Sequence, residues 1–375
     1  MKKTRITIMI SGYYGFGNAG DEAILASMVQ QFQKEIPDVE IIVLSEDPEK
    51  THKEHGVEAI SRKNFWRIFW MLGKVDLFVS GGGGLIQDTT GFNTVLYYLG
   101  MIQLARIRGC RVMCYAHGFG PLKMTKSRKL ARFVMNQSQV ITFRDEKSKL
   151  TAGGFGINKP PIYITADPVF ALTPAPDSQL EQYIEKLRIH PSSFNMGVSL
   201  RPWSSGVNYM EVVAAVSDRM IEQLNAKVYI FPFQHSQDMD ISRDLQKKMK
   251  NRSAVVLVEE PLPVTVLTGL MGKMDMILGM RLHSLIFAAS AGVPAVGISY
   301  DPKVSSIMEQ VGLTWLDVNH VDIGNLWSAC RHSCKNREMV IQGMKPAVDE
   351  LKKKAQDNTR YLVNLLKHFS KAEWK

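Results

Sequence analysis

The sequence predicts an α/β protein with two doubly wound domains and a C-terminal helical segment. Short β-branched runs alternate with amphipathic stretches through most of the 375 residues, a pattern typical of βα units around a parallel sheet. The length suits two domains, and a segment rich in proline, serine and polar residues near 172–192 separates two such series. We therefore expect domains at 1–175 and 185–345, facing each other across a cleft, and a helical segment at 346–375.

The first series predicts strands joined by helices. The expected strands are Arg5–Ile10, Glu40–Leu44, Leu77–Ser80, Arg111–Ala116, Gln139–Phe143 and Ile162–Ala166. The expected helices are Ala23–Ile36, Phe65–Lys74, Thr94–Ile107 and Ser127–Met135. Ligands of such folds bind beyond the carboxyl ends of the strands, so the loops after these strands are candidate binding segments.

The second series repeats this alternation. The expected strands are Met196–Leu200, Lys227–Phe231, Ala254–Val258, Met276–Leu278 and Val293–Ile298. The expected helices are Tyr209–Leu224, Ser242–Lys250, Val264–Met271, Ser284–Ala291 and Val304–Val311, and the last fifty residues have an all-helical pattern.

The composition favours an ordered protein of the cytoplasm. A hydrophobic fraction of 45% and a charged fraction of 22% exclude wholesale disorder. No apolar stretch reaches the ~18 to 20 residues that span a bilayer, and the N-terminal stretch turns glycine-rich and acidic too early for a signal peptide. We expect a cytoplasmic location, including a peripheral position at the inner face of the plasma membrane.

The cysteines do not form a typical metal-binding pattern. Cys110 and Cys114, like Cys330 and Cys334, are separated by three residues, and no histidine stands at zinc-finger spacing. We expect no metal and no cofactor.

The charge balance points to an acidic partner. Lys and Arg number 46 against 36 Asp and Glu, a net charge of +10, which suits nucleic acid, an anionic membrane or phosphorylated small molecules. Nucleic-acid motifs are missing and the charge is scattered, so we expect no nucleic-acid partner. The segment Arg62–Trp70 combines aromatic and basic residues, as in membrane-interface helices, although core packing of an amphipathic helix is the favoured interpretation.

A glycine-rich loop follows the first expected strand. Gly15 to Gly20 match the G-x-G-x-x-G pattern of dinucleotide-binding folds, in which Glu46 or Asp47 would hold a ribose. The glycines begin several residues past the strand and aromatic residues crowd them, which disfavours this interpretation. We expect instead a loop whose amides and aromatics face the cleft, followed by a helix that Asp21 caps. The alternative is a glycine-rich connector whose aromatic residues are buried.

Two further glycine-rich turns follow strands of the same domain. Four glycines after Ser80, with Gly82 and Gly83 at their centre, expose a row of N–H groups that suits an anion. A tight turn at His117–Pro121 follows the next strand. Three such loops at strand ends indicate a binding face.

Cationic residues stand at other strand ends. Arg144 ends an apolar strand, either as a salt-bridged residue at a helix start or as an anion clamp. Arg281 and His283 follow a strand and open an apolar helix, and Lys303 begins the next helix. A helix N-terminus itself favours anions, so these three indicate a phosphate or carboxylate site.

The motifs GYYGFGNAGDEAIL, SGGGGLIQD, FRDEKS, TADPVF and GMRLHSLIFAASAGVPAVGISYDPKV, in this order, resemble the polysaccharide pyruvyl transferase family. They are most similar to its bacterial cell-wall branch, the CsaB-type enzymes. This resemblance implies a glycosyltransferase-B-like pair of Rossmann-type domains. It implies transfer of the pyruvyl group of phosphoenolpyruvate to two hydroxyls of one sugar, as a 4,6-ketal, with release of phosphate. For this branch the sugar is N-acetylmannosamine in a lipid-pyrophosphate-linked precursor of secondary cell-wall polymer, which anchors surface-layer proteins.

Phosphoenolpyruvate carries a carboxylate and a phosphate, and the candidate residues can be matched to these two anionic groups. Arg144 and Arg281 would pair with the two anionic groups, because guanidinium binds them bidentately. Lys303 would add a charge at the leaving phosphate, and His283 would shuttle a proton. We expect Tyr14 and Phe16 either to line the acceptor side of the site or to close over the donor, and Asn18 to bind a sugar hydroxyl.

Two other functions fit the same plan. A nucleotide-sugar glycosyltransferase would need a ribose-binding carboxylate, for which Glu259 and Glu260 are the candidates. A non-catalytic protein that binds phosphorylated sugars would use Arg281, His283 and Lys303 for binding alone.

Overall fold

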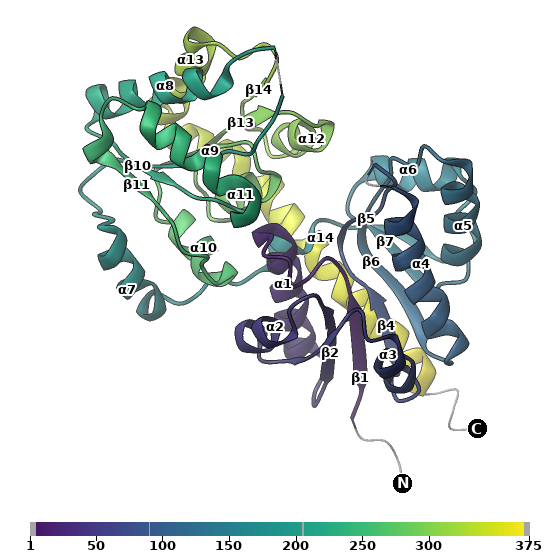
Figure 1. Ribbon diagram of the computed structural model, residues 1–375. Helices are drawn as coiled ribbons and strands as arrows, with labels where there is room; N and C mark the ends of the chain where they lie inside the picture. Colours follow the sequence, from purple (N-terminus) through teal and green to yellow (C-terminus); the bar gives the residue numbers. More distant parts are fainter. Residues whose placement is uncertain (1–4, 90, 205, 371–375) are drawn as a thin grey trace. The chain divides into compact units, whose positions relative to one another are not determined.

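The computed structural model describes residues 5–89, 91–204 and 206–370. In this part of the chain there are two compact units (Figure 1). Unit 1 holds the described residues of Met1–Phe16, Asp21–Leu172 and Leu351–Lys375. Unit 2 holds Gly17–Gly20 and the described residues of Thr173–Glu350. The expected ranges 1–175, 185–345 and 346–375 thus differ from the units at Gly17–Gly20 and after Leu351, and residues 371–375 lie outside the described residues.

The sheet of unit 1 is parallel throughout the described residues. Its strands are β1 (Thr7–Ser11), β2 (Glu40–Ser45), β3 (Glu58–Ser61), β4 (Leu77–Ser80), β5 (Gly83–Ile86), β6 (Arg111–Phe119), β7 (Val140–Phe143) and β8 (Ile162–Ile164). Their order is β3-β2-β1-β4-β6-β7-β8, with β5 paired to β6. This is a doubly wound order, in which the chain reverses direction across the sheet between β1 and β4.

Helices cover both faces of this sheet. They are α1 (Ala19–Glu35), α2 (Pro48–His55), α3 (Phe65–Leu72), α4 (Phe92–Ile107), α5 (Thr125–Met135), α6 (Glu146–Gly154), the 3₁₀ turn η1 (Pro168–Ala171) and part of α14 (Arg337–Ser370). Met9, Phe78 and Val112 pack with residues of α3, α4 and α5 in one hydrophobic core. Because alternate strand residues point to opposite faces, Tyr115 contacts the other layer, with its ring against Phe32 of α1.

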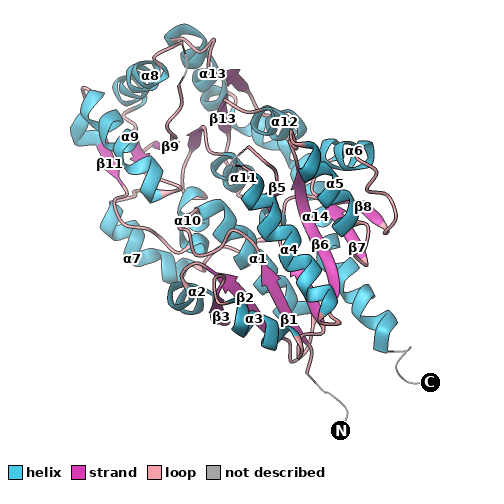
Figure 2. Cartoon of the chain, turned by 45° about the vertical axis from the view of Figure 1, so that its right-hand side comes forward, coloured by secondary structure: helices cyan, strands magenta, loops and turns pink. Residues whose placement is uncertain are grey.

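The second part of α14 is held on unit 1 by buried polar contacts. Asn358 is fully buried and its Oδ1 accepts hydrogen bonds from the hydroxyls of Thr142 (2.6 Å) and Thr165 (2.8 Å). Thr359 lies 2.8 Å from the Tyr115 hydroxyl. Figure 2 shows α14 running beside β6. The helical character of the C-terminal segment is confirmed as far as Ser370, but its packing on unit 1 is not evident from the sequence.

Unit 2 has the same doubly wound plan. Its strands are β9 (Asn195–Ser199), β10 (Lys227–Ile230), β11 (Val255–Leu257), β12 (Met276–Gly279), β13 (Ala295–Ser299) and β14 (Trp315–Asp317). In the described residues these strands are parallel, in the order β11-β10-β9-β12-β13-β14. The direction reverses between β9 and β12. The helices are α7 (Asp177–Leu187), α8 (Tyr209–Leu224), α9 (His235–Lys248), the 3₁₀ turn η2 (Arg252–Ala254), α10 (Val264–Met271), α11 (Leu282–Ser290), α12 (Pro302–Gln310), α13 (Ile323–Lys335) and the first part of α14.

The predicted class, two Rossmann-like α/β domains with a C-terminal helical segment, is confirmed. Every expected strand and helix is present, although α9 begins at His235 rather than at Ser242. Short elements were missed, namely β3, β5, β14, α2, α6 and α7. Helix α7 lies in the expected linker, where Leu180 is buried and packs against Gly269 of α10.

Within residues 5–89, 91–204 and 206–370, no helix is both long enough and apolar enough to span a membrane.

Candidate functional site

Tyr14 supports the loop after β1 from inside unit 1. Its side chain is fully buried, and its hydroxyl lies 3.7 Å from the Met28 sulfur. A Cβ atom on Gly12 or Gly81 would overlap this ring, so both glycines make room for it. Burial raises the pKa of the Tyr14 phenol well above its usual range. The expectation that Tyr14 contacts a substrate is therefore wrong.

The glycines after β4 lie in a packed segment rather than in an open loop. Gly83 begins β5 and pairs with His117 of β6. A Cβ on Gly82 would lie 3.1 Å from Ile24, and Gly83 has a φ of +96°, which favours glycine. The expected loop conformation is therefore wrong, while anion binding at Gly82 and Gly83 stays a prediction.

Phe16 lies in a half-buried aromatic cluster of unit 1. Its ring stacks on Tyr13, with the centroids 4.0 Å apart. The Arg62 guanidinium lies 5.1 Å from the Phe16 centroid and 4.1 Å from that of Tyr97. This cation–π contact holds the loop end against α4.

The carboxylates expected for a dinucleotide ribose are engaged elsewhere. Glu46 forms an ion pair with Lys63, and Asp47 caps α2 by accepting the Lys50 N–H (3.0 Å). A Cβ on Gly15 would collide with the backbone N of Asp47, so this glycine allows the two backbone segments to approach closely.

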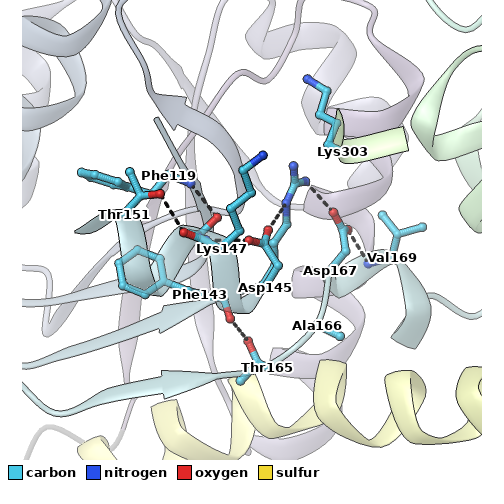
Figure 3. Close-up of polar contacts among 12 residues, drawn as sticks. Phe119, Phe143, Asp145, Lys147, Thr151, Thr165, Ala166, Asp167, Val169 and Lys303 are labelled. Carbon is cyan, nitrogen blue, oxygen red and sulfur yellow. Dashed lines mark hydrogen bonds and ion pairs between the residues drawn. The ribbon is translucent and has the colours of Figure 1, made fainter. Parts of the chain in front are cut away.

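Arg144 is held beyond the end of β7 by the carboxylates of Asp145 and Asp167, which Figure 3 labels. Its Nη1 donates to Asp167 Oδ2 at 2.8 Å, and its Nε lies 3.7 Å from Asp145 Oδ2. Asp167 is buried and also accepts the Val169 N–H. A Cβ on Gly118 would lie 3.0 Å from the guanidinium, so that glycine lets Arg144 lie over β6. Of the two roles expected for Arg144, the salt-bridged one is therefore present, and the ion pairs orient its guanidinium.

His117 is a buried histidine beside Arg144 that the sequence indicated only as part of a turn. The expected turn at 117–121 is wrong at its start, because β6 continues to Phe119. His117 Nε2 lies 3.1 Å from the Ser80 backbone oxygen, and its Nδ1 is buried without a hydrogen-bond partner among the described residues. Burial lowers the pKa of His117 to about 4, and the charge of Arg144 acts in the same direction.

Arg281 is fixed at the start of α11 by a fully buried carboxylate of unit 2. Its Nε donates to Asp238 Oδ2 at 3.0 Å, and its Nη2 donates to Asp238 Oδ1. Asp238 also accepts the backbone N–H groups of Phe233 (3.1 Å) and Gln234 (2.9 Å). A bidentate pair with a buried partner sets the position of the guanidinium.

Residues 17–20 pack against this same corner of unit 2. Ala19 N donates to the Phe233 oxygen at 2.8 Å, and Asn18 pairs with Gln234 as an isolated bridge. A Cβ on Gly20 would overlap His283 Nδ1 and lie 2.6 Å from its Cγ. The structure thus brings Asn18, Arg281 and His283 together on one unit.

The start of α1 differs from the expectation. The helix begins at Ala19, so Asp21 lies in its first turn and the prediction that Asp21 caps it is wrong. Asn18 takes this role, because its Oδ1 accepts the Gly20 N–H at 3.0 Å.

Lys303 and Arg201 add positive charge at the ends of β13 and β9, the two strands that flank β12 in unit 2. Lys303 lies in the first turn of α12, with its Nζ 3.5 Å from Asp301. Arg201 follows β9, its guanidinium lies 4.4 Å from the Tyr300 ring centroid, and its Nε is buried without a hydrogen-bond partner among the described residues. Because β9, β12 and β13 are adjacent, this edge suits an anionic ligand.

Four residues of these sites were not predicted from the sequence as site residues, namely Asp238, Arg201, His117 and Asp167. Arg201 and His117 could have been found, since each stands at the carboxyl end of an expected strand. Asp238 carries no local signal, because it lies within a helix and 43 residues before its partner Arg281.

Three comparisons with known proteins agree with this architecture. A profile of the polysaccharide pyruvyl transferase family matches residues 18–302. The amylovoran biosynthesis protein AmsJ of Erwinia amylovora is 21% identical over 92% of this chain and 95% of its own.

Solved structures share the fold at low identity. MnaA of S. aureus with UDP has a TM-score of 0.68 at 14% identity, covering 98% of this chain and 97% of its own. The UDP-GlcNAc 2-epimerase of Neisseria meningitidis has a TM-score of 0.65 at 13% identity, covering 96% and 100%. HepE of Anabaena with UDP-glucose has a TM-score of 0.64 at 11% identity, covering 97% and 100%. These likenesses show the fold, and the profile match shows that the chain belongs to the polysaccharide pyruvyl transferase family.

Proposed function

We propose that this transferase moves the pyruvyl group of phosphoenolpyruvate onto two hydroxyls of one sugar, as a 4,6-ketal. Family membership supports pyruvyl transfer onto a polysaccharide. The observation that carries the finer proposal is the corner of unit 2 where Asp238 holds Arg281 bidentately and His283 packs on Gly20. A fixed guanidinium beside an imidazole suits an anionic donor that must exchange protons.

The proposed reaction balances without an oxidant or reductant. One hydroxyl oxygen bonds to carbon-2 of the donor while carbon-3 takes a proton, so the double bond becomes single. The second hydroxyl oxygen then bonds to carbon-2 as the bond to the phosphate oxygen breaks, and phosphate leaves with the electron pair. The two hydroxyl protons are balanced by the new methyl group and by the released phosphate.

The residues of unit 2 receive distinct roles in this proposal. Arg281 binds an anionic group of the donor, and Lys303 in the first turn of α12 adds positive charge for the departing phosphate. His283 moves a proton, a role typically worth about 10²- to 10⁴-fold in rate. Asn18 binds a sugar hydroxyl beside them. No cofactor is included, since phosphoenolpyruvate is itself the donor substrate.

In unit 1 the proposal assigns binding to residues at the strand ends. Arg144, oriented by Asp167, binds an anionic group of a substrate. Gly82 and Gly83 supply backbone N–H groups, and Phe16 presents an aromatic face to a sugar ring.

The proposed acceptor is an N-acetylmannosamine unit of a lipid-pyrophosphate-linked amino-sugar disaccharide, a precursor of secondary cell-wall polymer for surface-layer anchoring. The motif resemblance to CsaB-type enzymes supports this choice. Such an acceptor places the enzyme at the cytoplasmic face of an anionic membrane. Helix α3 supports peripheral binding, because Phe65, Trp66 and Trp70 are 55%, 78% and 66% exposed, and tryptophan favours membrane interfaces.

One assay separates this proposal from its alternatives. The purified chain is incubated with phosphoenolpyruvate and the disaccharide acceptor, and phosphate is followed, with UDP-sugar replacing the donor in a parallel arm. We expect phosphate only when donor and acceptor are both present. Release of UDP indicates a glycosyltransferase, and binding without turnover indicates a phosphorylated-sugar-binding protein; either result contradicts the proposal.

Membrane binding has its own test. We expect the chain to float with vesicles that contain anionic lipid, and a Trp66→Ser, Trp70→Ser double variant to float less. Flotation that is independent of anionic lipid contradicts a charge-assisted contact.

A further inference from the structure

Three potential metal ligands meet beneath the glycine-rich loop of unit 1. They are Glu22 in the first turn of α1, and Glu54 and His55 at the end of α2. Their ligand atoms all lie within 4.8 Å of one another. The side chains of Glu22 and His55 are 6% and 4% exposed. Glu54 is more exposed, with 22% of its side chain accessible, so the cluster lies at the edge of the interior of unit 1.

The His55 imidazole provides an independent sign of a missing ligand. Its Nε2 is buried and has no hydrogen-bond partner among the described residues. The same atom lies 3.5 Å from Glu22 Oε2. Buried polar atoms are normally satisfied, and two ligands of a tetrahedral zinc ion, at about 2.0–2.2 Å from the metal, are separated by a comparable ~3.4 Å.

The electrostatics of the two carboxylates also favour a cation. The ligand oxygens of Glu22 and Glu54 lie within 4.8 Å of each other, so two carboxylates meet at one place. Lys50 Nζ lies 3.8 Å from Glu54 Oε1, so the carboxylate has a second oxygen for another partner. A divalent ion would relieve the repulsion and satisfy the imidazole together.

The contacts around Glu22 connect this cluster to the loop. Glu22 Oε1 accepts the Gly15 N–H at 2.8 Å, and the Tyr14 oxygen accepts the Glu46 N–H at 3.0 Å. An ion bound by Glu22 would thus tie α1, α2 and residues 14–15 together. A hydrogen bond from a backbone N–H to a metal-ligating carboxylate fixes the orientation of that carboxylate.

We propose that Glu22, Glu54 and His55 bind one zinc ion, which stabilises the loop after β1. One imidazole and two carboxylates suit zinc, and an all-oxygen ligand set would be needed for magnesium. Three protein ligands leave a fourth position for water. The proposed effect of the ion is to stabilise this loop, and it does not depend on which donor the enzyme uses.

The test uses the full chain after removal of metal with a chelator. Zinc binding is measured by titration calorimetry, zinc content by mass spectrometry and stability by thermal unfolding. We expect one high-affinity zinc per chain, a higher Tm with zinc, and no such rise with magnesium. His55→Ala and Glu54→Gln should each weaken binding by at least about 10- to 100-fold.

The controls make each outcome decisive. His320→Ala removes an exposed histidine that lies 3.8 Å from Asp317, and it should bind zinc as the unchanged chain does. Glu54→Gln keeps the shape of the side chain, so it decides the question if His55→Ala does not fold. No binding by the unchanged chain, or equal affinity in Glu54→Gln, overturns the proposal and leaves His55 beside Glu22 without a metal ion.

Discussion

Replacing Gly20 with alanine tests whether the position of the His283 ring matters for activity, and it removes no polar group. The added methyl would overlap Nδ1 of His283 and lie 2.6 Å from its Cγ, whereas ordinary contact begins at 3.4 Å. The ring must therefore move by at least 3.4 − 2.6 = 0.8 Å at Cγ. A misplacement of about 1 Å at a reacting group costs about 10²-fold in rate.

The expected result is a fall of about 100-fold in kcat for phosphate release, with the protein still folded. Alanine is the better helix former by up to about 1 kcal/mol, and Gly20 lies in the first turn of α1. The overlap with the His283 ring opposes this gain, so thermal unfolding should give a Tm close to that of the unchanged chain. The double variant with His283→Ala should be no slower than His283→Ala alone, because both changes act on one group.

Gly100→Ala is the matched control. Gly100 lies within α4 and a Cβ there meets nothing within 4 Å. This variant should keep full activity. If Gly20→Ala has the kcat of the unchanged chain while His283→Ala is inactive, the inference that activity depends on the packing of the His283 ring against Gly20 is refuted.

Three further perturbations follow from the geometry. Asp238→Asn leaves the Arg281 guanidinium without its buried counter-charge, and should cost about 3 kcal/mol in urea unfolding; an unchanged midpoint and slope would contradict this. Arg144→Lys replaces a bidentate fork with a point charge, and should lower kcat/KM by about 10- to 100-fold; wild-type steady-state kinetics would remove Arg144 from binding. His117 is neutral when folded because its pKa is lowered to about 4, whereas an unfolded histidine titrates near 6.5. Stability should be full above pH ~6.5 and fall by about 3 kcal/mol as the pH drops toward ~4; His117→Asn should flatten that decline in urea titrations at several pH values, and an equal decline would contradict it.

The sequence predicted the fold because its signals are local. The buried strands around Leu77 and Met276 are β-branched or apolar runs bounded by glycine, and such runs are visible without tertiary information. Short elements such as β3 and α7 were not predicted, because their stability comes from tertiary packing, as in the contact of Leu180 with Gly269.

Residues of the candidate site could be predicted only where a charged or titratable side chain directly follows a strand. Arg281, His283 and Arg144 follow strands, and the structure brings Arg281 and His283 together with Asn18. Tyr14 was misassigned because an aromatic residue in a glycine-rich loop suggests exposure, while its ring fills the space that Gly12 and other glycines leave. Long-range partners such as Asp238 depend on how α9 packs, which no local pattern reveals.

The most direct measurement is the stoichiometry of transfer, with phosphate and modified acceptor counted in one reaction by colorimetry and mass spectrometry. The unchanged chain should form one ketal-linked pyruvyl group for each phosphate released from phosphoenolpyruvate. Folded His283→Ala and Arg281→Ala variants should form neither product. Phosphate release without a modified acceptor, or near-normal ketal formation by His283→Ala, would contradict the chemistry assigned to this corner of unit 2.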